Sequence, residues 1–308
     1  MIKHTIEIAE RPASLSLKQK QLVIKLENGS RSYACEDVGV LILQHPAISL
    51  SAAALNALLE AGAVVLICGE NRLPTGMLLP TVTHTELVPR MMAQMAASLP
   101  ARKRLWQAIV KAKIAEQASR LSEPHRRRLQ RLAQAVKSGD LENLEGQAAR
   151  IYWAARFPEQ YEAGDKRDPQ GESFFNAALN YGYAIVRAAT ARALVSAGMQ
   201  PALGVFHRGR SNPFCLADDV MEPLRPIVDD CVYSMLRESP APRGGLEQVH
   251  RRKLLSILTS EVVCQAFTGP LMVALSRYAN NVFNVLTRDQ DTLFPPQLCS
   301  STDTEACG

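Results

Sequence analysis

The chain has 308 residues, of which 47% are hydrophobic, and carries a formal net charge of +5. This composition supplies a real core for one large domain or two smaller ones, so the chain should fold unaided. Apolar runs such as residues 61–68 are too short to span a bilayer, and the first ten residues lack an apolar signal core. We therefore expect a cytoplasmic protein, and the seven scattered cysteines, none in a Cys-x-x-Cys pair, indicate reduced thiols without a disulfide framework or a zinc site.

The charge is unevenly distributed along the chain. Residues 1–85 hold seven of the 35 basic and seven of the 30 acidic residues, so the remainder carries the whole positive excess. A basic C-terminal part mildly favours an anionic partner such as nucleic acid.

The first 84 residues predict a β-rich domain. Short apolar runs follow one another from His4 onward, and Asn28-Gly29 is a hairpin signal between two of them. A helix at about 51–60 and a strand at 63–68 complete this part.

From about Thr85 the apolar spacing changes to the helical period. We expect residues 85–294 to form a larger all-α domain, and residues 295–308, which lack apolar periodicity, to be a disordered tail. The predicted fold class is α+β, with a small N-terminal sheet domain before the helical one.

A helix capped by Asp140 is predicted to bury a stripe that begins at Leu144 and Ala148. Glu145 and Tyr152 lie on another face. Gly146 costs a helix interior about 1 kcal/mol relative to alanine, which favours a close approach of metal, backbone or ligand there. The alternative is a surface glutamate beside a packing glycine.

Residues 173–198 predict a long helix with Asn176 and Asn180 one turn apart. Its apolar residues indicate core. Buried amides must be hydrogen-bonded and often orient the ligands of a neighbouring site, so these two asparagines are candidates for that supporting role.

Residues 204–226 combine one histidine, three carboxylates and three arginines. Asn212-Pro213 predicts a helix over 213–222 whose carboxylates crowd one edge and would repel one another without a cation. A neutral imidazole with carboxylates suits Mg²⁺ or Mn²⁺, while a solvated ion-pair network is an equally good interpretation. The residues concerned are His207, Asp218, Asp219, Glu222, Arg208, Arg210 and Arg225.

Together, three stretches resemble the large subunit of the CRISPR adaptation complex, a metal-dependent integrase. They are LEGQAARIYW, NAALNYGYAIV and GVFHRGRSNPFCLADDVMEPLRPIVD, in the family's order. The N-terminal part is similar to the family's β-domain, so the resemblance extends to about Asp291. The overall length is most similar to the branch associated with type II systems.

The resemblance places the family's metal ligands and catalytic residues on Glu145, His207 and Glu222, with Asp219 or Asp218 as an auxiliary acid. It implies that Arg208, Arg210, Arg225 and Tyr152 contact DNA. Many members have aspartate where this sequence has Glu222.

The resemblance further implies the reaction and the partners. A DNA 3′-hydroxyl attacks a repeat phosphodiester, so that a prespacer duplex joins the leader-repeat DNA of a CRISPR array as a new spacer, while water in its place gives endonuclease activity. The implied partners are a second copy of the chain, joined through the N-terminal sheets with an edge strand in residues 2–35, and the small subunit of the adaptation complex. An effector nuclease is a further candidate partner, and no membrane is expected.

Three basic runs, at 102–104, 126–128 and 251–253, could touch DNA without reading its sequence, although such runs are usually solvated helix faces. Two rival functions stay open at this point. One is a stand-alone, structure-specific DNA repair nuclease that cuts without joining, and the other is a noncatalytic DNA-binding scaffold.

Overall fold

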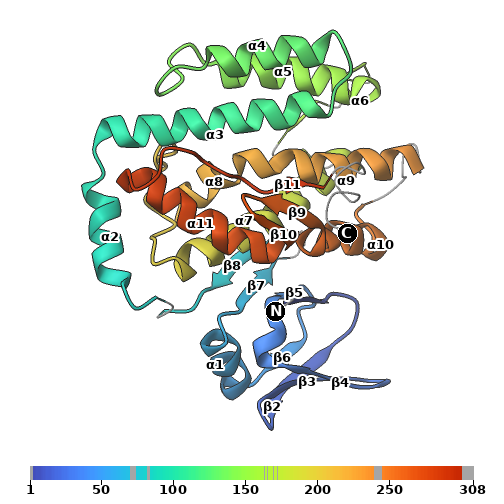
Figure 1. Cartoon of the computed structure of the whole chain (residues 1–308). Coiled ribbons are helices and arrows are strands. Elements are labelled where there is room, and N and C mark those ends of the chain that lie inside the picture. Colours follow the sequence, from blue (N-terminus) through green and yellow to red (C-terminus); the bar gives the residue numbers. More distant parts are fainter. Residues whose placement is uncertain are drawn as a thin grey trace.

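The computed structural model describes residues 3–69, 74–81, 84–162, 164, 166–168, 170–171, 173–238 and 245–299. Figure 1 shows two small sheets at one end of the molecule and a stack of helices above them. The predicted α+β class is confirmed. In the described part of the chain, no helix is long and apolar enough to cross a membrane.

The N-terminal part contains two four-stranded sheets. One has the order β1-β5-β7-β8 and the other β4-β3-β2-β6. The Asn-Gly signal is confirmed by the β3–β4 hairpin, and the helix expected at about 51–60 is confirmed as α1, which Ser51 caps. The elements are β1 His4–Ile8, β2 Ala13–Lys18, β3 Gln21–Leu26, β4 Gly29–Ala34, a 3₁₀ turn Cys35–Asp37, β5 Val38–Leu43, β6 Ile48–Leu50, α1 Ala52–Glu60, β7 Val64–Cys68 and β8 Pro74–Leu78.

The first sheet lies between two apolar cores, which explains why β5 and β7 are apolar at almost every position. Val40 and Val64 pack into the core of the helical part, whereas Leu41 and Val65 face the core beneath α1 and the second sheet. The change to helical apolar spacing near residue 85 therefore falls between β8 and the first helix after it, α2 (Leu87–Ala96). The hydrophobic core of the helical part nevertheless includes residues of β5 and β7.

The C-terminal part is built mainly from helices. Figure 1 shows α3 crossing the molecule, with α4 and α5 on one side of it and α8, α9 and α11 on the other. The helices are α2 Leu87–Ala96, α3 Leu99–Ser119, α4 His125–Ala135, α5 Leu144–Arg156, α6 Pro158–Glu162, α7 Phe174–Ser196, α8 Cys215–Met221, α9 Arg225–Glu238, α10 Gln248–Ser256 and α11 Leu271–Thr287, with 3₁₀ turns at Glu222–Leu224 and Ile257–Thr259.

A small sheet interrupts this helical part, where the sequence predicted helices only. It has the order β10-β9-β11, with β9 at Glu261–Cys264, β10 at Phe267–Pro270 and β11 at Gln297–Leu298. The prediction of a disordered tail was therefore wrong for residues 295–299, because β11 pairs with β9. Residues 300–308 lie outside the described residues.

One member of the basic run 251–253 has a structural role, and is neither the solvated residue nor the DNA contact that the sequence left open. Arg251 on α10 is fully buried, and its guanidinium pairs with Glu7 Oε1 at 3.1 Å and Glu10 Oε1 at 2.8 Å. A buried cation needs such partners, so Arg251 links the helical part to the first strand.

Candidate active site

Glu145 lies in the first turn of α5, and the chain before it fixes its position. Asn143 caps the helix by accepting the N–H of Gly146, while the Asp140 carboxylate accepts the N–H groups of Leu144 and Glu145 at 2.9 and 3.0 Å. Asn143 is therefore the N-cap, and the Asp140 carboxylate, which the sequence predicted as the cap, accepts two further N–H groups of the first turn. Glu145 is held at the positive end of the helix.

Gly146 has a different explanation from the predicted approach of a ligand. It lies in the first turn of the helix, and a Cβ atom there would be 2.7 Å from Asn143 Oδ1. Glycine thus makes room for the capping side chain.

Asp219 holds the loop that carries His207. Its fully buried carboxylate accepts the N–H groups of Val205, Phe206 and His207 at 2.7, 3.0 and 3.1 Å. It also contacts His207 Nδ1 at 2.7 Å, and this hydrogen bond raises the pKa of His207 against the opposing effect of burial. The contacts of Asp219 are those of a residue that positions the loop and the imidazole.

Gly204 is required for the same loop. A Cβ atom at this position would lie 2.3 Å from the carbonyl oxygen of His207 and 3.0 Å from Asp219 Oδ2. The backbone can therefore wrap around the Asp219 carboxylate only without a side chain at residue 204.

Glu145 and Glu222 converge on one cation, the ammonium of Lys113 on α3. Lys113 Nζ lies 2.5 Å from Glu145 Oε1 and 2.5 Å from Glu222 Oε2, although the three residues come from separate elements. The other oxygen of Glu222 accepts a hydrogen bond from Arg225 Nε at 2.9 Å. The site is thus a pair of carboxylates joined by Lys113, with Arg225 as a second cation on Glu222.

Opposite charges in this site keep Glu222 and Lys113 ionised despite their burial. Burial would raise the pKa of Glu222, but Arg225 and Lys113 outweigh it and lower the pKa to about 2. Burial opposes the charge of Lys113 too, yet the two glutamates raise its pKa above the usual value. Glu222 and Lys113 are therefore both ionised at neutral pH.

A divalent cation fits this carboxylate pair. Two carboxylate oxygens that converge on one positive charge are the hard donors that Mg²⁺ and Mn²⁺ accept. Among the described residues, however, His, Cys, Asp and Glu side chains form no ready cluster of three ligands. His207 Nδ1 is engaged by Asp219, so only the Nε2 side of the ring is left to face a ligand.

Asp218 has partners other than those of Glu145 and Glu222. It pairs with Arg187 Nε at 2.7 Å and accepts a hydrogen bond from Asn212 Nδ2 at 2.7 Å. Helix α8 begins at Cys215, later than predicted, because Asn212 Oδ1 accepts the N–H of Phe214 in the turn before it. Asp218, Arg187 and Arg225 line a cavity of about 550 Å³.

Asn176 and Asn180 support this cavity. Their side-chain oxygens accept hydrogen bonds from the two terminal nitrogens of Arg167 at 3.2 and 2.8 Å. Arg167 and Asn180 both line the cavity, and the guanidinium lies 5.4 Å from the ring centre of Tyr183. The asparagines therefore orient an arginine, where the sequence predicted support for the metal ligands.

The predicted DNA contact of Tyr152 was wrong. Its side chain is fully buried, and its hydroxyl donates to Asp229 Oδ2 at 3.0 Å. Tyr183 donates to the other oxygen of Asp229. Burial raises the pKa of Asp229 to about 6, and these three residues form a buried network behind Arg225.

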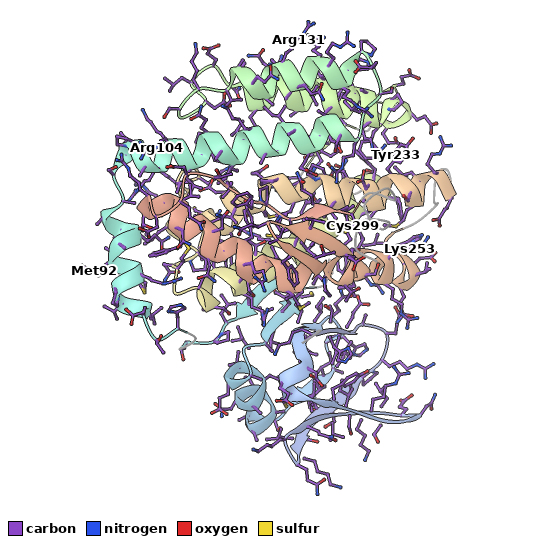
Figure 2. All side chains as sticks on the ribbon, viewed as in Figure 1. Met92, Arg104, Arg131, Tyr233, Lys253 and Cys299 are labelled. Carbon is purple, nitrogen blue, oxygen red and sulfur yellow. The ribbon has the colours of Figure 1, made fainter. Side chains whose placement is uncertain are left out.

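The other predicted DNA-binding residues lie at the surface or in the site. Arg208 and Arg210 are exposed in the loop after His207, while Arg225 pairs with Glu222. Figure 2 shows Arg104 and Arg131 at the surface of α3 and α4, so these helices also present positive charge to solvent.

Sequence reasoning missed Lys113, although the chain contains a signal for it. Lys113 follows Ile109 and Val110 by four and three residues, on the buried stripe of α3. A charged residue on such a stripe needs an anionic partner, so this position predicts a buried ion pair.

The fold and the site define an α+β protein whose helical part carries a buried carboxylate pair, a loop histidine and several arginines. A family model described as CRISPR associated protein Cas1 matches residues 6–268. The chain therefore belongs to the Cas1 family.

Two curated relatives support this assignment. A protein of Neisseria meningitidis serogroup C (strain 8013), named CRISPR-associated endonuclease Cas1, is 41% identical over 75% of this chain and 75% of its own length. A protein of Pyrobaculum aerophilum, named CRISPR-associated endonuclease Cas1 2, is 30% identical over 91% of this chain and 98% of its own.

Solved structures share the fold at lower identity. A casposase bound to integration product aligns with a TM-score of 0.76 at 20% identity, over 99% of this chain and 98% of that one. A Cas6-RT-Cas1–Cas2 complex aligns with a TM-score of 0.74 at 19% identity, over 97% of this chain and 36% of the longer one. A TtCas1–DNA complex aligns at 0.58 and 19% identity, over 92% of this chain and 91% of that one.

Proposed function

We propose that this chain is a DNA integrase and endonuclease of CRISPR adaptation that inserts short DNA fragments into a CRISPR array. The observation that carries the proposal is the convergence of Glu145 and Glu222 on one cation beside the His207 loop. Membership in the Cas1 family, with relatives named endonucleases, supports the activity. The casposase bound to its integration product supports the joining reaction.

Glu145, Glu222 and Nε2 of His207 would hold Mg²⁺ or Mn²⁺. When bound, the ion would help deprotonate the attacking hydroxyl and stabilise charge on the phosphate. Glu145 and Glu222 supply the anionic oxygens, and Asp219 keeps the imidazole oriented through Nδ1. Lys113 keeps the two carboxylates together before DNA and metal bind.

In the proposed reaction, the 3′-hydroxyl oxygen of the incoming strand forms a bond to a backbone phosphorus of the repeat. The bond from that phosphorus to its own 3′ oxygen breaks, so one phosphodiester replaces another without ATP. Arg225, Arg208 and Arg210 would hold the phosphate oxygens. Water as the nucleophile gives hydrolysis at the same site.

The proposed assembly contains DNA, a second copy of the chain and a small subunit. The structures titled as Cas1–Cas2 and Cas1–DNA complexes support the small subunit and the DNA. Strand β4 is an edge strand whose residues 29–32 are exposed, so it can accept a strand of a second copy. We place this assembly in the cytoplasm, and an effector nuclease is a further proposed partner.

A strand-transfer assay tests the proposal. Wild type and Glu145→Gln are incubated with the small subunit, Mg²⁺ or Mn²⁺, a labelled duplex with free 3′-hydroxyls and a supercoiled plasmid carrying a CRISPR repeat. The control variant is Glu142→Gln, an exposed carboxylate three residues earlier. We expect wild type and the control to join the label to the plasmid, and Glu145→Gln to bind DNA without joining it.

Two other outcomes would replace the proposal. Metal-dependent cutting without joining would identify a repair nuclease. DNA binding without activity in any of the proteins would identify a scaffold.

A further inference from the structure

Phe206 is an exposed aromatic residue directly before His207. Phe206 is 49% exposed, although phenylalanine side chains are more often buried. Its backbone N–H donates to Asp219 Oδ2 at 3.0 Å, in the same set of contacts that positions His207. The ring is therefore attached to a backbone held in one place next to the site.

The ring of Phe206 is also held from one side. It stacks on Trp106 of α3 with 4.1 Å between the ring centres and 1° between the planes, and Trp106 is only 2% exposed. His207 makes a T-shaped contact with it, with the ring centres 5.4 Å apart. Since Trp106 covers one face of Phe206, the exposed area includes the opposite face.

A flat, fixed aromatic face open to solvent fits a nucleobase. Bases stack on such rings irrespective of sequence, because every base presents a π-face. The charges nearby favour a ligand with an anionic backbone. Arg208 is exposed two residues after Phe206, and Arg102 and Lys103 precede Trp106 by about one helical turn. An apolar protein side chain would gain nothing from these cations.

We propose that Phe206 is a stacking platform for one unpaired nucleobase near the reactive 3′ end of the incoming DNA strand. It acts as a positioning residue, because a base held on its outer face fixes the strand relative to the His207 loop. This inference rests on the proposed function, since it requires a DNA strand in the site.

Fluorescence of 2-aminopurine tests this inference without depending on activity, because stacking quenches this base analogue. Duplexes with single-stranded 3′ ends carry 2-aminopurine at successive positions, and a distant second label reports binding by anisotropy. We expect wild type to quench one position or two adjacent positions, Phe206→Leu to lose this quenching and Phe206→Trp to keep it. Leu203→Ala, which removes another exposed apolar side chain of the same loop, is the control and should quench like wild type.

A cycle with abasic DNA isolates the contact between ring and base. Phe206→Leu should weaken binding of the intact strand by about 5- to 150-fold, the range for one stacked base. It should leave binding of a strand that is abasic at the quenched position almost unchanged. Equal losses on both strands would overturn the platform.

The remaining outcomes separate the two proposals. If wild type binds DNA but quenches no position, the platform is wrong and the proposed function stands. If wild type binds no DNA, the proposed function fails as well. If Phe206→Leu binds DNA normally but loses the small subunit in pull-down, Phe206 is a protein contact and the platform is wrong.

Discussion

Replacing Lys113 by methionine should destabilise the protein at neutral pH, and divalent ions should reverse part of the loss. The change removes the ammonium that lies 2.5 Å from both Glu145 and Glu222, while methionine keeps most of the side-chain volume. Glu145 and Glu222 then lie close together without the ammonium between them. Among the described residues, Arg225 still pairs with Glu222.

The size of the effect follows from the pKa of Glu222. Lys113 and Arg225 lower it from 4.5 to about 2, which corresponds to roughly 3 kcal/mol in the free energy of unfolding above pH 4.5. A lowered pKa stabilises the folded state above the unfolded value, and this contribution is lost as the pH falls toward 2. Arg225 has the larger effect on this pKa, so we assign Lys113 about 1 kcal/mol of the total.

Urea denaturation at pH 7.5 and pH 4.5, with and without Mg²⁺ or Mn²⁺, measures this effect. We expect Lys113→Met to lose about 1–2 kcal/mol at pH 7.5. The loss should be almost the same at pH 4.5, because the contribution from Glu222 is lost only as the pH falls from 4.5 toward 2. Lys111→Met, on the half-exposed side of the same helix, is the matched control and should change little. If metal stabilises Lys113→Met no more than it stabilises wild type, the ammonium does not occupy the position of a divalent ion.

Three further predictions concern the framework of the site. Burial raises the pKa of Asp229 to about 6, so protonation of this carboxyl favours the folded state, and the contribution is lost as the pH rises from about 4 through 6. Asp229→Asn should therefore reduce the change in unfolding free energy between pH 4.5 and pH 7, measured in urea, by about 1–3 kcal/mol. Arg251→Ala should lower the free energy of unfolding by about 3–5 kcal/mol, because it leaves Glu7 without its buried partner, whereas Arg252→Ala at an exposed position should lower it by under about 0.5 kcal/mol. Similar denaturation midpoints for the two variants would contradict the structural role of Arg251. Gly204→Ala should lower both the rate of strand transfer and the melting temperature, since its Cβ would lie 2.3 Å from the backbone oxygen of His207. An unchanged rate and an unchanged melting temperature would contradict the loop geometry.

The sequence predicted elements whose cause is local. The short apolar strands of the N-terminal part, the Asn-Gly hairpin and the helix at about 51–60 each depend on residues within a few positions of one another, and the structure confirms them. The carboxylate of Asp140 was correctly placed at the start of α5 for the same reason.

Features that depend on distant contacts were missed. Lys113 lies 109 residues from Glu222 in the chain, so no short spacing reveals that they meet. Tyr152 was placed on an outer face because its partner Asp229 lies 77 residues away. β11 is a strand only because β9 offers it an edge, and the two-residue length of β11 leaves no periodic signal.

The separate roles of the acids in 218–222 also needed the structure. Repulsion between neighbouring carboxylates predicted a cation among them, but not which acid would meet which cation. Asp218 pairs with Arg187, Asp219 binds the loop backbone, and Glu222 meets Lys113 and Arg225. Three neighbouring acids therefore have three different surroundings.

The central claim, that Glu145 and Glu222 form one reaction site, is tested most directly by single-turnover strand transfer with Glu145→Gln, Glu222→Gln and the double variant, all shown to be folded and to bind DNA. Residues that act as a unit lose activity together, so we expect each single change to abolish most joining and the double change to cost little more. Losses that multiply in the double variant, or joining at the wild-type rate in either single variant, would contradict it.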